Sequence, residues 1–209
     1  MQNDNHNMKF NIINYQKIYD GFCKVFKIKF NHTKFDGSVS NTLDHELFVR
    51  QPCVGVLPYN PNTDEIILIE QFRIGAIDPL KDFQTNFNPW VLEIVAGVID
   101  KKNESPESTA IRECIEEAGC TVDNLIPMHD YLVSPGANNE RIKLYCGIFS
   151  HEYKPGLFGL DHENEDIKTY IISLDEAREL LSSGKICNAA SIVAIQWLLL
   201  NKHKILDLV

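Results

Sequence analysis

The chain has 209 residues, a formal net charge of −9 and a hydrophobic fraction of 44%. This length suits one domain with a sizeable core plus a small extension. The negative charge argues against a general binder of nucleic acid or anionic membranes, which would need a basic surface. Anionic small molecules remain possible ligands, because bound metal ions would reverse the charge of a local site.

The six cysteines form no CxxC pair and show no zinc-ligand spacing with histidine. Several lie in apolar runs and are interpreted as buried thiols. No signal peptide is recognisable in the sequence MQNDNHNMKFNIIN, so we expect a reducing, cytoplasmic location. The apolar run IVAIQWLLL is too short to span a bilayer.

The first fifty residues predict a polar start followed by a β-hairpin. Residues 1–14 are mostly polar and are expected to be partly frayed. Alternating apolar and lysine residues at 22–30, a turn near Asp36-Gly37 and a second run at 38–49 indicate two paired strands. A hairpin cannot stabilise itself, so this one must lie on another surface, either its own domain or a partner subunit.

The rest of the chain predicts strands and helices in a mixed order. Strands are expected at residues 54–59, 66–71, 91–95, 125–133, 142–149 and 167–172. Two helices close the chain, at 176–182 after Ser173 or Asp175 and at 189–202 after Asn188. The polar segment 78–88 is interpreted as a long loop. Mostly antiparallel strands with helices on both faces indicate a mixed α/β/α sandwich.

A short helix near the middle of the chain carries a group of carboxylates. Ser105 suits its N-cap, Pro106 its first position and Gly119 its left-handed end. One side is expected to hold its apolar residues, Ala110, Ile111, Cys114, Ile115 and Ala118. The opposite side is expected to hold its acidic residues, Glu113, Glu116 and Glu117. A lone acidic helix is usually a solvated face, but clustered oxygen ligands also suit Mg2+.

The surrounding residues decide between these two interpretations. The stretch GVIDKKNESPESTAIRECIEEAGC resembles the Nudix box, in which Gly and Glu precede Arg-Glu-apolar-x-Glu-Glu-x-Gly. The residues that match are Gly97, Glu104, Arg112, Glu113, Glu116, Glu117 and Gly119. One additional residue separates Gly97 from Glu104, and it falls in the turn 100–103. We therefore expect a longer loop before an intact helix.

The resemblance extends from about Tyr19 to Leu200 and implies a family member similar to bacterial ADP-ribose pyrophosphatases. It rests on EQFRIGA, PWVLEIVAG, SPGANNER and GLDHENEDI, and on a proline at position 135. It implies a Nudix-type α/β/α sandwich with a mixed sheet at 51–209. A small antiparallel β extension at 1–50 would serve dimerisation and substrate contact.

The resemblance also implies roles for the acidic residues. The metal ligands would be the Ala96 carbonyl, Glu113, Glu117 and Glu165, holding two or more Mg2+, with Mn2+ as a possible substitute. Glu163 would be the general base, on a loop that closes over substrate. Glu116 would support the metals as ligand or neighbour. The structural residues of the motif would be Gly97, Glu104, Arg112 and Gly119, with Glu104 and Arg112 paired.

Substrate contacts are implied in the same way. Arg73 would contact the diphosphate, and Phe22 would stack on adenine. The other expected contact residues are Glu46, Arg50, Val98, Ser134 and Glu140, the last with an open role. Family members are homodimers that exchange N-terminal hairpins, so each site would include residues of both chains.

The function implied is Mg2+-dependent hydrolysis of ADP-ribose to AMP and ribose 5-phosphate. Two alternatives remain. The first is a Nudix hydrolase of another nucleoside diphosphate derivative, such as a nucleotide sugar or dinucleotide, since His45 replaces a family arginine at the adenine end. The second is a non-catalytic nucleotide-binding module, which would require lost metal ligands, whereas Glu113, Glu116 and Glu117 are all present.

Overall fold

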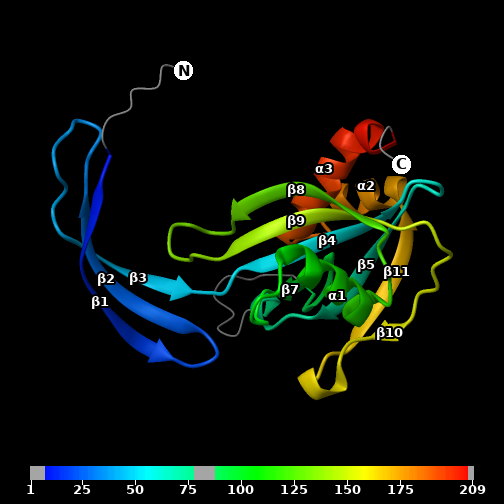
Figure 1. Ribbon diagram of the computed structural model, residues 1–209, viewed down its shortest axis with the longest axis horizontal. Coiled ribbons are helices and arrows are strands. Elements are labelled where there is room, and N and C mark those ends of the chain that lie inside the picture. Colours follow the sequence, from blue (N-terminus) through cyan, green and yellow to red (C-terminus); the bar gives the residue numbers. More distant parts are fainter. Residues whose placement is uncertain (1–7, 78–87, 207–209) are drawn as a thin grey trace. The chain divides into compact units, whose positions relative to one another are not determined.

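Figure 1 presents the computed structural model, which describes residues 8–77 and 88–206. The chain divides into two compact units. We call the first the N-terminal unit; it contains the chain up to Gln51 together with Leu132–Arg141. The second, the sandwich unit, contains Pro52–Tyr131 and the chain from Ile142 onward. The long loop predicted at 78–88 lies, except for Asn88, outside the described residues.

The N-terminal unit is built on a three-stranded antiparallel sheet with the order β1-β2-β3. Its strands are β1 (Phe10–Asp20), β2 (Lys24–His32) and β3 (Leu43–Val49). The prediction of a frayed start is wrong from Phe10 onward, because β1 pairs with β2 from Phe10 opposite His32 to Asp20 opposite Lys24. Polar residues within β1 weaken its alternation, so only the pairing with β2 identifies it as a strand.

The segment Leu132–Arg141 joins two strands of the sandwich unit and hydrogen-bonds to the end of β3. The Phe48 amide donates to the Ala137 carbonyl at 2.8 Å, and the Asn139 amide donates to the Phe48 carbonyl at 3.3 Å. The Arg50 amide donates to the side-chain oxygen of Asn139 at 2.8 Å. These bonds place residues 134–140 beside Arg50, although about ninety positions of sequence lie between them.

The sandwich unit contains an eight-stranded mixed sheet with the order β10-β11-β5-β4-β9-β8. Its strands are β4 (Cys53–Asn60), β5 (Glu65–Phe72), β6 (Trp90–Glu93), β7 (Val95–Val98), β8 (Asn124–Leu132), β9 (Arg141–Ile148), β10 (Leu157–Phe158) and β11 (Ile167–Ser173). β6 pairs with β5, and β7 pairs with β4. β4 and β9 are parallel, whereas β4 and β5 are antiparallel, which makes the sheet mixed.

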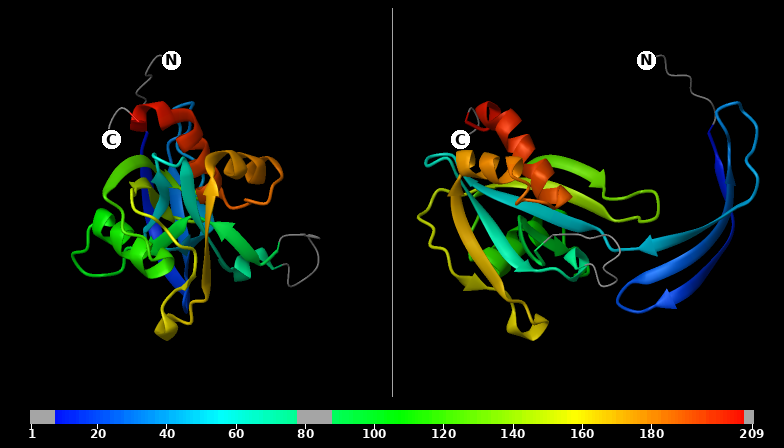
Figure 2. Two further views of the ribbon diagram at one scale, coloured as in Figure 1. Left: turned by 90° about the vertical axis from the view of Figure 1, so that its right-hand side faces the viewer. Right: turned by 180° about the vertical axis from the view of Figure 1, so that it is seen from behind.

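Helices cover both faces of this sheet, as Figures 1 and 2 show. The helix α1 (Pro106–Ala118) lies on one face, and α2 (Leu174–Ser182) and α3 (Ala189–Leu206) lie on the other. Each face buries its own apolar cluster, one containing Ala110 and Cys114 of α1 and the other Ile195 and Leu198 of α3. This arrangement confirms the predicted α/β/α sandwich with a mixed sheet and an antiparallel N-terminal extension.

The element predictions differ from the structure in two places within the sandwich unit. The strand expected at 91–95 is two short strands, separated at Ile94, whose amide donates to the buried Ser191 hydroxyl of α3 at 2.9 Å. The two-residue strand β10 was not predicted. None of the helices within residues 8–77 and 88–206 is both long and apolar enough to cross a membrane.

Candidate active site

The ends of α1 are fixed by the residues that the sequence indicated. The Ser105 hydroxyl accepts a hydrogen bond from the Ser108 amide at 3.1 Å, with Pro106 at the first helical position. Gly119 closes the helix in the left-handed region with φ 58°. A side chain there would be strained, and its Cβ would collide with the Phe158 ring.

The faces of α1 differ from the prediction. Ala110, Cys114 and Ala118 are buried as expected, but Ile111 and Ile115 are 40% and 50% exposed. Glu113 and Glu117, which were expected on the opposite side, are only 9% and 3% exposed. At about 100° per residue, these two carboxylates flank the buried stripe, whereas the two isoleucines lie beyond its other edge. The helix therefore presents carboxylates to the protein interior.

A glycine in β7 makes room for one of them. A Cβ atom at Gly97 would collide with the carboxylate of Glu113, so any larger residue would displace that group. Next to it, the Ala96 amide donates to Oε2 of Glu117 at 3.0 Å. β7 therefore packs closely against the Glu113 carboxylate at Gly97 and hydrogen-bonds to the Glu117 carboxylate through Ala96.

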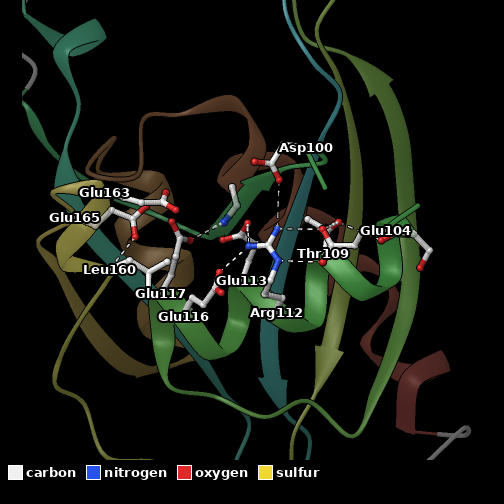
Figure 3. Close-up of polar contacts among 12 residues, drawn as sticks. Asp100, Glu104, Thr109, Arg112, Glu113, Glu116, Glu117, Leu160, Glu163 and Glu165 are labelled. Atoms are coloured by element: carbon white, nitrogen blue, oxygen red, sulfur yellow. Dashed lines mark hydrogen bonds and ion pairs between the residues drawn. The ribbon is translucent and has the colours of Figure 1, made fainter. Parts of the chain in front are cut away.

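Arg112 lies at the centre of an ion-pair network (Figure 3). Its Nε contacts Glu104 Oε1 at 3.0 Å, and its Nη1 contacts Glu116 Oε2 at 2.6 Å and Glu113 Oε1 at 2.8 Å. The Thr109 hydroxyl donates to the second oxygen of Glu104 at 3.0 Å. Glu104, which directly precedes the N-cap residue Ser105, is thereby bound to the middle of the helix.

The two buried carboxyl groups have pKa values far above the ordinary value of 4.5. Burial raises the pKa of Glu113 to about 7, with the Glu116 charge adding to the shift and Arg112 opposing it. Burial raises the pKa of Glu117 to about 8, and the charges of Glu113 and Glu165 raise it further. Arg112 therefore supplies too little positive charge for the whole cluster.

We expect the stability of the metal-free protein to fall as pH rises from about 5 to 8. The unfolded carboxyls ionise near their ordinary pKa, but Glu113 and Glu117 resist ionisation in the folded chain up to about 7 and 8. The unfolded state is therefore favoured increasingly across this window. Thermal unfolding at about pH 5, 6.5 and 8 measures the effect, and millimolar Mg2+ should raise Tm at the highest pH much more than at the lowest. Equal Mg2+ effects at both extremes would contradict the prediction.

Two further carboxylates lie on the segment between β10 and β11. A 3-10 turn, Asp161–Glu163, ends at Asn164 in the left-handed region with φ 56°. Oε2 of Glu165 accepts from the Leu160 amide at 3.1 Å, whereas Glu163 is exposed and lies 3.6 Å from His162. Figure 3 shows both side chains on the Glu117 side of α1. The fold thus brings carboxylates from two distant stretches of sequence together.

The carboxylates are engaged by the protein itself in this conformation. Within the described part of the chain, no three acidic, histidine or cysteine side chains lie close enough together to hold a metal ion. Arg112 holds Glu113 and Glu116, and backbone amides hold Glu117 and Glu165. The donor set nevertheless fits a hard divalent cation, because it consists of oxygen ligands whose buried charge lacks compensation.

A second arginine lies where β5 ends. Arg73 Nε contacts Oε1 of Glu93 on β6 at 2.6 Å. Burial raises the pKa of Glu93, and the Arg73 charge opposes that shift. The Arg73 side chain is 44% exposed, so its guanidinium remains accessible to an anion. Val98, the last residue of β7, pairs with Cys53.

The remaining expected substrate contacts belong to the N-terminal unit. Arg50 Nε lies 3.4 Å from Glu140 Oε1, and its guanidinium lies 5.7 Å from the centre of the Phe22 ring. The Phe22 ring is 95% exposed. Ser134 begins the turn that leads to Glu140, and its carbonyl accepts from the Asn138 amide at 3.0 Å. Glu46 is exposed on β3, opposite Lys27.

Sequence reasoning missed three residues that organise the site. Thr109 anchors Glu104, Glu93 anchors Arg73, and Ser191 fixes the break between β6 and β7. The importance of Glu93 could have been predicted from the sequence, since it is the single charged residue in the apolar run PWVLEIVAG. The roles of Thr109 and Ser191 could not have been predicted, because the sequence does not distinguish a buried helical Thr or Ser from an exposed one.

Comparison with known proteins identifies the family. Residues 49–192 match the NUDIX domain family. The chain is 40% identical to ADP-ribose pyrophosphatase of Escherichia coli strain K12 over 190 residues, which cover 91% of this chain and 88% of that protein. It is 38% identical to ADP-ribose pyrophosphatase of Haemophilus influenzae over 191 residues, with coverage of 91% and 86%. The chain belongs to the Nudix family.

Two other relatives are more distant. GDP-mannose pyrophosphatase of Enterobacter sp. strain 638 is 26% identical over 193 residues, covering 91% of this chain and 95% of that protein. A crystal structure of an ADP compounds hydrolase matches with a TM-score of 0.70 at 18% identity, covering 94% of this chain and 96% of the other. This structural match shows that the fold is shared.

Proposed function

We propose that this protein hydrolyses the diphosphate of ADP-ribose to AMP and ribose 5-phosphate in a reaction that depends on divalent cations. The observation that carries the proposal is the identity of 38–40% to ADP-ribose pyrophosphatases along about nine-tenths of the chain. The buried carboxylates with raised pKa values support it, because they provide oxygen ligands for cations beside an arginine that can contact a diphosphate.

The cation is Mg2+, with two or more per site, and Mn2+ can replace it. Its ligands are the Ala96 carbonyl and the carboxylates of Glu113, Glu117 and Glu165, with Glu116 beside them. When bound, the cations neutralise the diphosphate and lower the pKa of the attacking water. To hold a cation, Glu113 would exchange its ion pair with Arg112 for the metal, while Glu104 would keep the guanidinium in place.

The remaining residues bind and orient the substrate. The Arg73 guanidinium contacts the diphosphate and is directed by the buried Glu93. The exposed Phe22 ring stacks on adenine, and Arg50, Glu46, Val98, Ser134 and Glu140 complete the contacts. The Glu163 carboxylate takes the proton of the attacking water. Its side chain is exposed on a turn, so it can approach that water when substrate is bound.

The test is product release from a panel of ADP-ribose, GDP-mannose, a diadenosine polyphosphate and a nucleoside triphosphate, with and without Mg2+. AMP should appear fastest from ADP-ribose, and only with the cation. Faster turnover of GDP-mannose would instead favour a nucleotide-sugar hydrolase, which the Enterobacter relative makes the second candidate. Tight binding of ADP-ribose without turnover of any compound would indicate a binding module.

The protein is a homodimer that exchanges its N-terminal sheets, and the exposed face of β1 forms the interface. On that face β1 exposes Phe10, Ile12 and Tyr15 at 74%, 52% and 68%, more apolar surface than a free strand usually leaves in water. The expected arrangement places residues of both chains in each site.

Charges on that face should separate the dimer. We expect the double variant Ile12→Glu/Tyr15→Glu to sediment as a monomer and to show a raised KM for ADP-ribose, because buried unpaired carboxylates destabilise an apolar interface. The matched control is Asn11→Glu/Gln16→Glu, which places the same charges on the alternate face of β1 opposite Asn31 and Lys27. A double variant that stays dimeric with unchanged KM would contradict this interface.

A further inference from the structure

The C-terminal end of α1 is completed by a segment that is distant in sequence. An α-helix leaves its last four carbonyls without partners inside the helix. The amides of Gly119 and Cys120 return to the carbonyls of Ile115 and Cys114. The carbonyls of Glu116 and Ala118 instead accept hydrogen bonds from the segment after β9. The helix that carries the acidic cluster is therefore capped by a part of the chain that follows it by about forty residues.

Three contacts fasten this segment to the helix. The Tyr153 hydroxyl donates to the Ala118 carbonyl at 2.7 Å, and the Gly159 amide donates to the Glu116 carbonyl at 3.2 Å. Between them, the Phe158 ring lies so close over Gly119 that a Cβ there would collide with it. Gly119 therefore both ends the helix and leaves the space that the Phe158 ring occupies.

The other side of the segment is fixed to β11. Thr169 is 1% exposed, and its hydroxyl accepts from the Gly156 amide at 2.9 Å while its own amide donates to the Gly156 carbonyl at 3.0 Å. β10 pairs with the first residues of β11, Leu157 with Lys168 and Phe158 with Ile167. The two strands close residues 159–166 into a short loop whose base rests on α1.

That loop carries Glu163 and Glu165, and its own shape depends on its base. Gly159 has φ 105°, and a Cβ there would lie 2.7 Å from Cβ of Glu165. The Leu160 amide holds the Glu165 carboxylate at 3.1 Å. Any displacement of residues 158–160 would therefore move both carboxylates relative to Glu113 and Glu117.

We propose that Tyr153 and Phe158 are positioning residues, which fasten the loop bearing Glu163 and Glu165 to the C-terminal end of α1 and so set the distance between the two groups of carboxylates. This inference rests on the proposed function for the catalytic role of Glu163. Neither residue touches substrate; each acts through the loop. The carboxylates of α1 stay in place without them, since Arg112 and Ala96 hold those side chains.

The test is Tyr153→Phe, which removes one hydroxyl and keeps the ring. We expect kcat for ADP-ribose to fall about two- to tenfold, as the loss of one hydrogen bond allows. KM should stay within about twofold, because neither residue touches substrate. The Mg2+ concentration for half-maximal rate should rise, because the same loop carries Glu165, a proposed cation ligand. Phe158→Ala should give the same pattern with a larger loss of kcat.

Hydrogen exchange provides a second readout that does not depend on activity. Amides of residues 156–165 should exchange faster in Tyr153→Phe, while amides in the middle of α1 keep their wild-type rates. The matched control is Tyr170→Phe, which removes a hydroxyl that donates to Glu70 at 2.7 Å on the neighbouring strand. It should leave both kcat and the exchange of the loop unchanged.

Wild-type kcat together with wild-type exchange in Tyr153→Phe would overturn the inference. So would an equal loss of kcat in Tyr170→Phe, because that would indicate general destabilisation. The exchange is measured without substrate. A wild-type chain that turned over no ADP-ribose would therefore refute the proposed function, while the exchange data would still decide whether Tyr153 fastens the loop.

Discussion

Glu117→Gln should lower kcat for ADP-ribose by on the order of a thousandfold while the protein stays folded. The substitution removes a buried negative charge from the proposed cation site but keeps the shape of the side chain. Cation stabilisation of a developing charge is worth several kcal/mol, and each ~1.4 kcal/mol is tenfold in rate. Steady-state kinetics over a range of Mg2+ concentrations measures the loss, and raising Mg2+ should recover only part of it.

The folded state of this variant should not be weakened. The Ala96 amide can donate to the carbonyl oxygen of the introduced glutamine as it does to the carboxylate of Glu117. A neutral group also suits a position that is 3% exposed. We therefore expect Tm of the metal-free variant at about pH 8 to be at least that of the wild type. Glu107→Gln is the control, since this exposed carboxylate lies on the same helix and bonds Tyr145. Near-normal turnover in Glu117→Gln would refute the assigned ligand.

Glu163→Gln should lower kcat about a hundred- to ten-thousandfold, the range that general bases contribute. Unlike Glu117, whose carboxylate accepts from a backbone amide, Glu163 is exposed and its carboxylate faces His162. Its loss should therefore leave Tm and Mg2+ affinity close to wild type. Kinetics and isothermal titration with Mg2+ separate the two effects.

Asp161→Asn is the matched control for Glu163→Gln. Asp161 is an exposed acid of the same 3-10 turn, and it contributes a backbone carbonyl to the turn that the substitution retains. Its kcat should stay within about twofold of wild type. If Mg2+ affinity collapsed in Glu163→Gln, Glu163 would be a cation ligand and another group would be the base.

Local chemistry made much of α1 and the sheet predictable. A hydroxyl at Ser105, a proline at position 106 and a glycine at 119 fix the ends of α1 through its own backbone, so the sequence alone located it. The strands β4, β5, β9 and β11 were located equally well, because each is a short apolar run that buries itself in the sheet.

Other features depended on contacts that no local pattern records. The apolar side of α1 was misjudged because Ile111 and Ile115 look as apolar as Cys114, and only packing against the sheet decides which of them is covered. β1 was missed because its pairing with β2, not its own alternation, makes it a strand. β10 is too short to leave a pattern at all.

The sequence by itself determined the family, the acidic helix and the carboxylates on it that we propose as cation ligands. It did so because the spacing of Gly97, Glu104, Arg112 and the helix residues is dictated by one turn and one helix. Only the tertiary structure decided which carboxylates are buried and that Arg112 already contacts Glu104, Glu113 and Glu116. It also decided that Tyr153 and Phe158 join the loop of Glu163 to the helix. Burial, pKa and the distance between residues far apart in the chain are properties of packing, and they exist only once the chain has folded.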